Sequence, residues 1–148
     1  MVRVLVKTSI NEWATALEGI VEIEELRMVD GSSYDFSGDA DIKVYFAKRN
    51  HSCYEAFDGK GGIVAHSMYP PYGVIHLDGD EDWHNHNGPE DSIDIRLVLL
   101  HEIGHTLGLR HSRHKSSVMK NNYEHLKSDI WLSKYDIRAV RSLYDRFR

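Results

Sequence analysis

The sequence predicts an α+β fold built around a buried helix that carries metal-binding histidines. Apolar residues follow helical spacing near the start, the middle and the end of the chain, while shorter β-branched and aromatic segments such as residues 42–46 resemble strands. Two histidines, His101 and His105, stand one turn apart on the middle helix. The order of these elements indicates an α+β domain with the metal-binding helix at its centre.

The first element has two possible forms. Residues 2–7 alternate valine with other residues, as a strand does, yet the apolar positions from Val2 to Leu17 also form a helical stripe. Ser9 and Glu12 resemble a capping box, which marks the start of a helix. We therefore predict a helix at least from residue 10 to Leu17, ended by Gly19, and residues 1–7 stay open between strand and helix.

The next part of the chain contains short strand candidates separated by loops. Residues 21–26 alternate weakly, and residues 42–46 form a stronger strand pattern. Residues 50–88 are rich in glycine, histidine, aspartate and proline, with short apolar pieces at 63–65 and 74–77. Irregular backbone with so many potential ligands is typical of loops organised by metal ions.

Two helices are predicted in the C-terminal half. Asp91 or Ser92 can cap a helix over about residues 93–107, which is apolar on more than one side and should be largely buried. After a long loop, residues 133–136 can cap a last amphipathic helix. Its inward-facing residues are predicted to be Ile137, Val140, Leu143 and Tyr144.

The string HEIGHTLGLRH, which begins at His101, predicts a catalytic zinc site. His101 and His105 project from one helix face, and Gly108 can end the helix and return His111 as a third ligand. Three neutral imidazoles leave the fourth tetrahedral position of Zn²⁺ open for water. Glu102 can lean over the metal without binding it. The alternative, a solvated helix rich in histidine, explains the short motif but not the glycine and the third histidine.

Other histidines and acidic residues indicate further metal sites. Three histidines lie in the loop-rich half: His51, His66 and His76. With Cys53 as a fourth ligand they could hold a second zinc, or each could be an ordinary loop histidine. The glycine-rich acidic turns at residues 58–62 and 78–82 suit Ca²⁺, or could be solvated turns.

Composition limits the classes of function. The 148 residues, with a formal net charge of −5, predict a single domain over residues 1–148. We expect no nucleic-acid partner, because no basic run exists, and no membrane span, because no apolar run approaches ~18 residues. One cysteine excludes an internal disulfide framework. The charged first residues do not resemble a signal peptide, so we expect an intracellular product or a domain excised from a longer precursor.

The extended histidine motif, with Ser112 after the third histidine and Met119 beyond it, resembles the matrixin branch of the metzincins, the catalytic domain of matrix metalloproteinases. Further segments follow the family's metal loops, Met-turn and last helix: residues 40–42, 57–66, 76–81, 117–119 and 132–144. The resemblance covers nearly the whole chain. It implies a zincin-like fold with about three helices and a twisted mixed sheet of four to five strands, here without a pro-segment cysteine switch or a C-terminal accessory domain.

The resemblance also implies two zinc ions and one calcium ion. Cys53 stands where the family's structural zinc has an aspartate ligand beside His51, His66 and His76, and we expect it to bind zinc by substitution. The implied calcium ligands are the side chains of Asp58, Asp78 and Glu81 and the carbonyls of Gly59, Gly61 and Ile63. Met119 is implied to form an apolar floor under the catalytic imidazoles.

The activity implied by the resemblance is endopeptide hydrolysis. Glu102 would take a proton from the zinc-bound water and deliver it to the leaving amine. An extended substrate would lie along the edge strand at Val64 and Ala65. Leu97, Val98 and Tyr123 would line the pocket after the scissile bond, with Asn121 on its lower rim, and this pocket should prefer an apolar residue.

The same resemblance implies an extracellular, monomeric protein. Its partners would be protein or peptide substrates and the family's protein inhibitors. A catalytically inactive zinc-binding module of the same fold is the alternative. The intact Glu102 argues against that alternative, because a binding module needs no base at this position.

Overall fold

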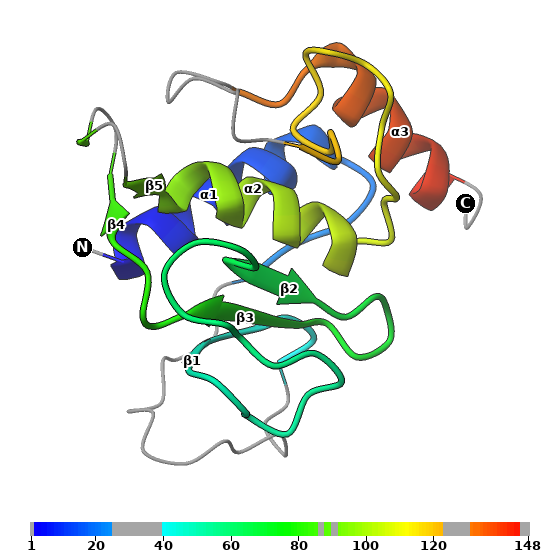
Figure 1. Ribbon diagram of the computed structural model, residues 1–148. Helices are drawn as coiled ribbons and strands as arrows, with labels where there is room; N and C mark the ends of the chain where they lie inside the picture. Colours follow the sequence, from blue (N-terminus) through cyan, green and yellow to red (C-terminus); the bar gives the residue numbers. More distant parts are fainter. Residues whose placement is uncertain (1, 25–39, 86–87, 90–91, 123–130, 146–148) are drawn as a thin grey trace.

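A computed structural model describes residues 2–24, 40–85, 88–89, 92–122 and 131–145 (Figure 1). The elements follow in the order α1 (Val2–Ala16), β1 (Lys43–Ala47), β2 (Ala65–Ser67), β3 (Val74–Asp78), β4 (Trp83–His84), β5 (Ile93–Asp94), α2 (Ile95–Thr106) and α3 (Lys134–Tyr144). Three helices with a small mixed sheet confirm the predicted α+β class. Among these helices of the described chain, none has both the length and the apolar composition that a bilayer crossing requires.

Among the described residues the main sheet has three strands, in the order β1-β3-β2, against the four to five expected. β1 runs parallel to β3, whereas β2 is antiparallel to it and pairs His66 with His76. The short strands β4 and β5 form a separate parallel pair. The strand predicted at residues 42–46 is shifted by one residue, and the weak strand predicted at residues 21–26 is absent over residues 21–24, while 25–26 lie outside the described residues.

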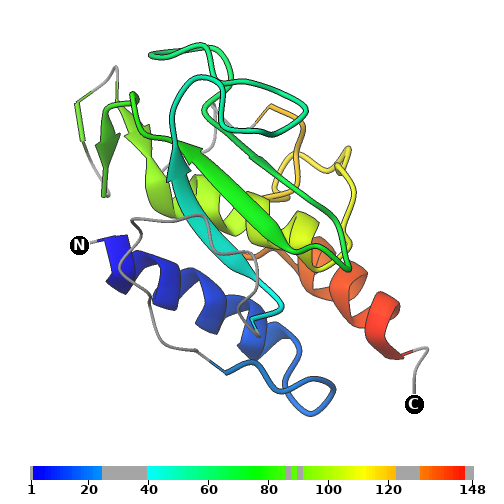
Figure 2. The ribbon, with the colours of Figure 1, turned by 90° about the horizontal axis from the view of Figure 1, so that it is seen from below.

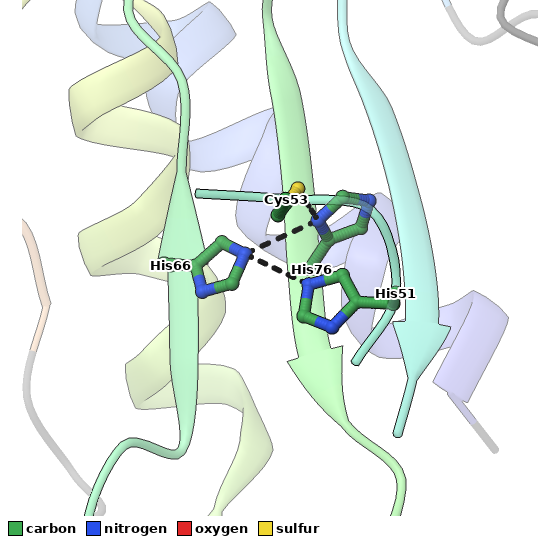
Figure 3. A group of neighbouring side chains, drawn as sticks. All are labelled: His51, Cys53, His66 and His76. Carbon is green, nitrogen blue, oxygen red and sulfur yellow. Dashed lines mark hydrogen bonds between the residues drawn. The ribbon is translucent and has the colours of Figure 1, made fainter. Parts of the chain in front are cut away.

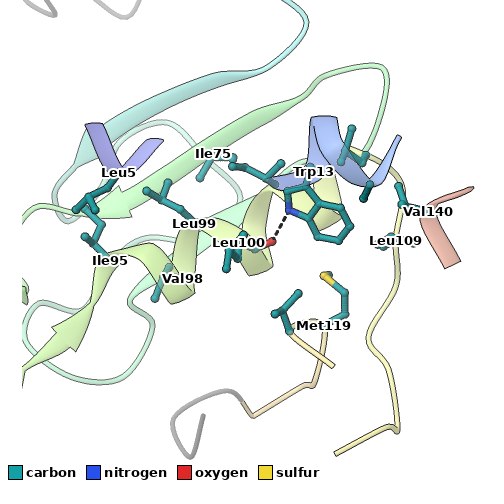
Figure 4. Packing of buried hydrophobic residues seen from close by; sticks show 14 of the residues in the cluster. Leu5, Trp13, Ile75, Ile95, Val98, Leu99, Leu100, Leu109, Met119 and Val140 are labelled. Carbon is teal, nitrogen blue, oxygen red and sulfur yellow. Dashed lines mark hydrogen bonds between the residues drawn. The ribbon is translucent and has the colours of Figure 1, made fainter. Parts of the chain in front are cut away.

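Helix α2 lies at the centre of the molecule. It contacts α1 along one side and β2 and β3 along another, and in Figure 2 the strands cross α2 while α1 lies beside it. The core joins these layers through Leu5 and Trp13 of α1, Ile75 of β3 and Leu100 of α2 (Figure 4). The indole N–H of Trp13 donates a hydrogen bond to the carbonyl of Leu100 at 3.1 Å, so α1 is fixed against the metal helix.

Helix α1 resolves the alternatives at the start of the chain in favour of a helix. It runs from Val2 to Ala16, so the predicted helix from residue 10 is confirmed, but Ser9 and Glu12 lie inside it and do not cap its start. Ser9 is buried within α1, and its hydroxyl has no hydrogen-bond partner in the described chain. The carboxylate of Glu12 pairs with Arg96 of α2 at 2.5 Å instead of reaching back to the Ser9 backbone. Gly19, with a φ of 74°, lies in the turn that follows α1.

Asp94, not Ser92, caps helix α2. Its carboxylate accepts hydrogen bonds from the backbone N–H groups of Arg96 and Leu97. The predicted cap is displaced because residues 93–94 pair with β4 before the helix starts, and the other predicted cap, Asp91, lies outside the described residues. Every residue of α2 except Arg96 is buried. This burial follows from apolar residues on all sides of the helix.

Helix α3 begins with the predicted capping box. The Ser133 hydroxyl accepts from the Asp136 backbone, and the Asp136 carboxylate accepts from the Ser133 backbone. Ile137, predicted to face inward, is 36% exposed. The buried stripe passes instead through Asp136 and Val140, which lie one turn apart and shift the core-facing side away from Ile137.

Gly104→Ala should destabilise the protein by up to about 2 kcal/mol. A Cβ at Gly104 would lie 2.2 Å from Sδ of Met119 and 3.1 Å from Trp13. Overpacking of this kind costs about 1–3 kcal/mol, and the ~1 kcal/mol that alanine gains over glycine inside a helix offsets part of this cost. Denaturant unfolding of the variant measures the loss.

Ser142→Ala on the exposed side of α3 is the control, and it should change stability by no more than about 0.5 kcal/mol. An unchanged or raised unfolding free energy in Gly104→Ala would show that Met119 can move aside without cost.

Candidate metal centres

Helix α2 and the turn after it bring three predicted zinc ligands together. His101 and His105 lie on α2, and Gly108, with a φ of 99°, turns the chain so that His111 approaches them. Nε2 of His105 lies 3.1 Å from Nε2 of His101 and 3.2 Å from Nε2 of His111. The three ligand atoms all lie within 4.8 Å of one another, which is the arrangement of a three-histidine metal site.

Main-chain carbonyls orient the two helix imidazoles. Nδ1 of His101 lies 2.7 Å from the carbonyl oxygen of Val118, and Nδ1 of His105 lies 2.8 Å from that of Leu109. A carbonyl oxygen can only accept, so each Nδ1 carries the proton and each Nε2 presents a lone pair. Two lone pairs 3.1 Å apart repel, and a bound cation removes this repulsion. These contacts therefore fit a metal ion between the rings.

Burial keeps the same two rings neutral. It lowers the pKa of His101 to about 4 and also lowers the pKa of His105, because a charged imidazolium loses its hydration inside the protein. Neutral imidazole is the form that binds metal ions, so no proton has to be displaced at neutral pH.

Asp136 of α3 supports the carbonyl that orients His101. One carboxylate oxygen accepts a short hydrogen bond from the Ser117 hydroxyl, and the other accepts from the Val118 backbone N–H at 3.2 Å. The Ser117 hydroxyl oxygen accepts in turn from the Met119 N–H at 3.1 Å. The start of α3 thus holds the turn that carries the Val118 carbonyl.

Glu102 lies next to His101 on α2 and is only 4% exposed. Burial raises the pKa of its carboxyl group to about 7, although a hydrogen bond from Ser67 opposes the rise. The Ser67 hydroxyl donates to Oε2 of Glu102 at 2.5 Å. A carboxyl group with a pKa near neutrality can accept a proton and return it at neutral pH.

Met119 packs against the part of α2 that lies between the two helix histidines. Its side chain is 2% exposed, and its sulfur lies so close to Gly104 that no Cβ fits there. The backbone of Ser112 donates to the Met119 carbonyl at 2.7 Å, which closes the loop after the third histidine. An apolar, polarisable sulfur therefore lies directly beneath this stretch of the metal helix.

A second cluster forms on the opposite side of β2 from α2, where His51, Cys53, His66 and His76 converge (Figure 3). β2 supplies His66, β3 supplies His76, and the loop after β1 supplies the other two. Nε2 of His66 lies 3.1 Å from Nε2 of His51 and 3.2 Å from Nδ1 of His76, while Sγ of Cys53 lies 3.1 Å from the same Nδ1. The structure therefore brings together all four residues predicted for this site.

The donor set of the second cluster fits zinc. Nδ1 of His51 lies 2.9 Å from the Arg49 carbonyl, so Nε2 presents a lone pair to the cluster. Burial lowers the pKa of His76 to about 4 and lowers that of His66, while it raises the pKa of the Cys53 thiol. Imidazole nitrogen and thiolate sulfur are both zinc ligands, four such ligands complete a tetrahedral site, and a bound zinc would offset the burial of the thiolate charge.

The predicted calcium ligands lie in two facing turns. Oδ1 of Asp58 accepts from the Ile63 N–H at 3.2 Å, and Oε1 of Glu81 accepts from the Gly61 N–H at 2.7 Å. Oδ2 of Asp78 is buried and has no hydrogen-bond partner in the described chain. Burial raises the pKa of Glu81, and the nearby charges of Asp78, Asp58 and Asp82 raise it further. Carboxylates that repel one another in this way are stabilised by a cation, and oxygen ligands suit Ca²⁺.

The residues predicted to bind substrate are partly described. Val64, just before β2, and Ala65, its first residue, are half-buried. The side of β2 away from β3 has no strand partner in the described residues. Leu97 and Val98 are buried in α2, and Asn121 is exposed. Tyr123 lies outside the described residues. In the described residues, β2 thus has a free edge near the cluster of His101, His105 and His111. The pocket predicted after the scissile bond is only partly described.

Several supporting residues escaped the sequence analysis. The carbonyls of Val118 and Leu109 belong to the backbone and leave no mark in a sequence pattern. The sequence pattern predicts Asp136 only as part of a helix cap and gives no role to Ser67. The capping box is a sequence signal for Asp136, because a buried carboxylate at a helix start can also accept hydrogen bonds from a neighbouring segment.

Comparison with known proteins agrees with this geometry. A family model described as matrixin matches residues 3–145. Macrophage metalloelastase of Rattus norvegicus is 40% identical over 111 residues, which are 72% of this chain and 23% of that protein. Matrix metalloproteinase-16 of Homo sapiens is 36% identical over 110 residues, which are 72% of this chain and 18% of that protein. Metalloendoproteinase 5-MMP of Arabidopsis thaliana is 39% identical over 113 residues, which are 71% of this chain and 31% of that protein. The chain spans less than a third of each relative.

Proposed function

Because the chain belongs to the matrixin family, we propose that it is a zinc-dependent endopeptidase that hydrolyses peptide bonds in extended protein substrates. The observation that carries this proposal is the position of Glu102. Its buried carboxyl group follows His101 on α2, beside three imidazoles whose ligand atoms converge. Zinc binding alone requires the histidines but not this carboxyl group, so the pair of features favours an enzyme over an inactive zinc-binding module.

The mechanism assigns one residue to both proton transfers. Zinc, when held by His101, His105 and His111, supplies a Lewis acid that polarises the scissile carbonyl and makes water more acidic. Glu102 accepts the proton of the attacking water and then donates it to the leaving amine nitrogen. Burial, which raises the pKa of the Glu102 carboxyl group, makes this group a better proton acceptor than an exposed carboxylate.

Substrate binding follows from the free edge of β2. An extended peptide can add to this edge as a further strand, with main-chain hydrogen bonds to the segment at Val64 and Ala65. We assign the pocket after the scissile bond to Leu97, Val98, Asn121 and Tyr123. The apolar side chains at 97 and 98 favour an apolar substrate residue there.

Two further ions complete the proposal. His51, His66, His76 and Cys53 hold a structural zinc, supported by the convergence of their four ligand atoms. The Asp58, Asp78 and Glu81 side chains, with the carbonyls of Gly59, Gly61 and Ile63, hold a calcium ion, supported by the unpartnered Oδ2 of Asp78. The protein acts as an extracellular monomer and is a target for the family's protein inhibitors.

Glu102→Gln should lower the rate of peptide hydrolysis by about 10²–10⁴-fold and leave zinc binding intact. The amide keeps the shape of the side chain but cannot accept the proton of water, and loss of a general base costs about 10²–10⁴-fold in rate. Cleavage of a quenched peptide and zinc content by mass spectrometry measure the two effects. Glu18→Gln, at an exposed position, is the matched control and should keep full activity. Equal activity in Glu102→Gln and the parent would exclude the mechanism.

Cys53→Ser should lower the zinc content from about two ions per chain to about one, because a neutral hydroxyl is a poor zinc ligand. Cys53→Asp should restore about two, since a carboxylate binds zinc. In cobalt-substituted protein, a thiolate-to-cobalt absorption band should be present in the parent and absent from both variants. Ser52→Ala is the control. About two zinc ions in Cys53→Ser would remove Cys53 from the ligand set.

Calcium should stabilise the parent but not Asp78→Asn. A ligand at one hundred times its Kd stabilises by about 2.7 kcal/mol when it binds only the folded state. Denaturant unfolding with added calcium, and with a calcium chelator, measures this effect. Asp145→Asn, at an exposed position after α3, should respond to calcium as the parent does. The same calcium response in Asp78→Asn would rule out Asp78 as a ligand.

A further inference from the structure

We propose that Ser67 is a positioning residue for Glu102, and that its hydroxyl holds the carboxylate in the orientation needed for proton transfer. This inference rests on the proposed peptidase function. The contact that suggests it is the hydrogen bond from Oγ of Ser67 to Oε2 of Glu102, at 2.5 Å. Ser67 is the last residue of β2, and Glu102 lies on the buried helix α2, so the bond joins two elements that are distant in sequence.

The alternation of β2 aims Ser67 at the catalytic helix. Successive side chains of a strand point to opposite faces. His66 points toward His51 and His76 in the second cluster, as Figure 3 shows, and the next side chain, Ser67, therefore points toward α2. Pairing of Ser67 with Ile75 and of His66 with His76 in β3 fixes this register. The position of the Ser67 hydroxyl is thus set by the sheet and not by a mobile loop.

Within the described residues, Ser67 is the only group that hydrogen-bonds the Glu102 carboxylate. A glutamate has three rotatable bonds, and its last torsion is broad, so burial alone does not fix the direction of the two oxygens. A hydrogen bond to an ionised carboxylate is among the strong ones in proteins. Because it engages Oε2, it leaves Oε1 as the oxygen that can accept a proton from water.

This role predicts an effect on turnover and not on substrate binding. The proposed peptide contacts use the backbone edge of β2, which does not need the Ser67 hydroxyl. A misplaced catalytic group costs up to about 10²-fold in rate, and loss of a supporting hydrogen bond costs about 10–100-fold. Removal of the hydroxyl should therefore lower kcat by about 10–100-fold and leave KM within about twofold.

The test compares Ser67→Thr with Ser67→Val in the zinc-loaded protein, measured as kcat, KM and zinc content. The two side chains have nearly the same shape and both suit a strand, but only threonine carries a hydroxyl. We expect Ser67→Val and Ser67→Ala to lose about 10–100-fold in kcat and Ser67→Thr to recover most of it, with unchanged zinc content. Equal kcat in the threonine and valine variants, or a loss that lies in KM or in zinc content, would overturn the proposal.

A readout independent of activity is the carbon-13 NMR signal of the Glu102 carboxyl carbon, assigned by its absence in Glu102→Gln. This signal should shift in Ser67→Val and stay near the parent position in Ser67→Thr, and an equal position in both would overturn the proposal. An inactive zinc-loaded parent would refute the peptidase function itself. An active parent with a fully active Ser67→Val would refute only the role of Ser67.

Discussion

The burial of α2 is the constraint on which the rest of the structure depends. A helix enclosed on all sides must still carry His101, Glu102 and His105, and each of these polar groups needs a partner inside the protein. The carbonyls of Val118 and Leu109 serve the histidines, and they come from the irregular loop that follows α2. Regular secondary structure would have used these carbonyls in its own hydrogen bonds. The long loop is therefore a requirement of the metal site.

The hydrophobic core and the metal site meet on helix α2. Trp13 bonds to the α2 backbone at Leu100, and Met119 presses against Gly104 on the same helix. Leu100 and Gly104 directly precede His101 and His105, so each contact lies on a turn of α2 that holds a histidine. Asp136 adds a polar support from α3 through Ser117 and Val118. Stability of the core and precision of the site thus depend on the same few contacts.

Much of this arrangement could be predicted, because metal ligands leave a dense pattern in sequence. The spacing of His101, His105 and His111 predicts their convergence. The glycine-rich acidic turns can be recognised in the sequence from their residue types. The start of α2 was misplaced, because Asp94 closes a short strand that has no pattern of its own. Ser9 and Glu12 have the spacing of a capping box but lie inside α1. The actual partner of Glu12 is Arg96, which is far away in the chain and cannot be found from a local pattern. Backbone carbonyls and the Ser67 hydroxyl act through tertiary distance, which a local pattern does not encode.

The hydrogen bond between Trp13 and Leu100 spans 87 residues, and the contact that orients His101 spans 17. Contacts of large sequence separation form late in folding, because the loop between them must first be closed. A partly folded chain with α2 alone would present His101 and His105 at the right spacing, yet with rings free to turn and no third imidazole. High affinity for zinc would then appear only after the loop at residues 109–118 had folded against α2, so that metal content would report the folding of this loop.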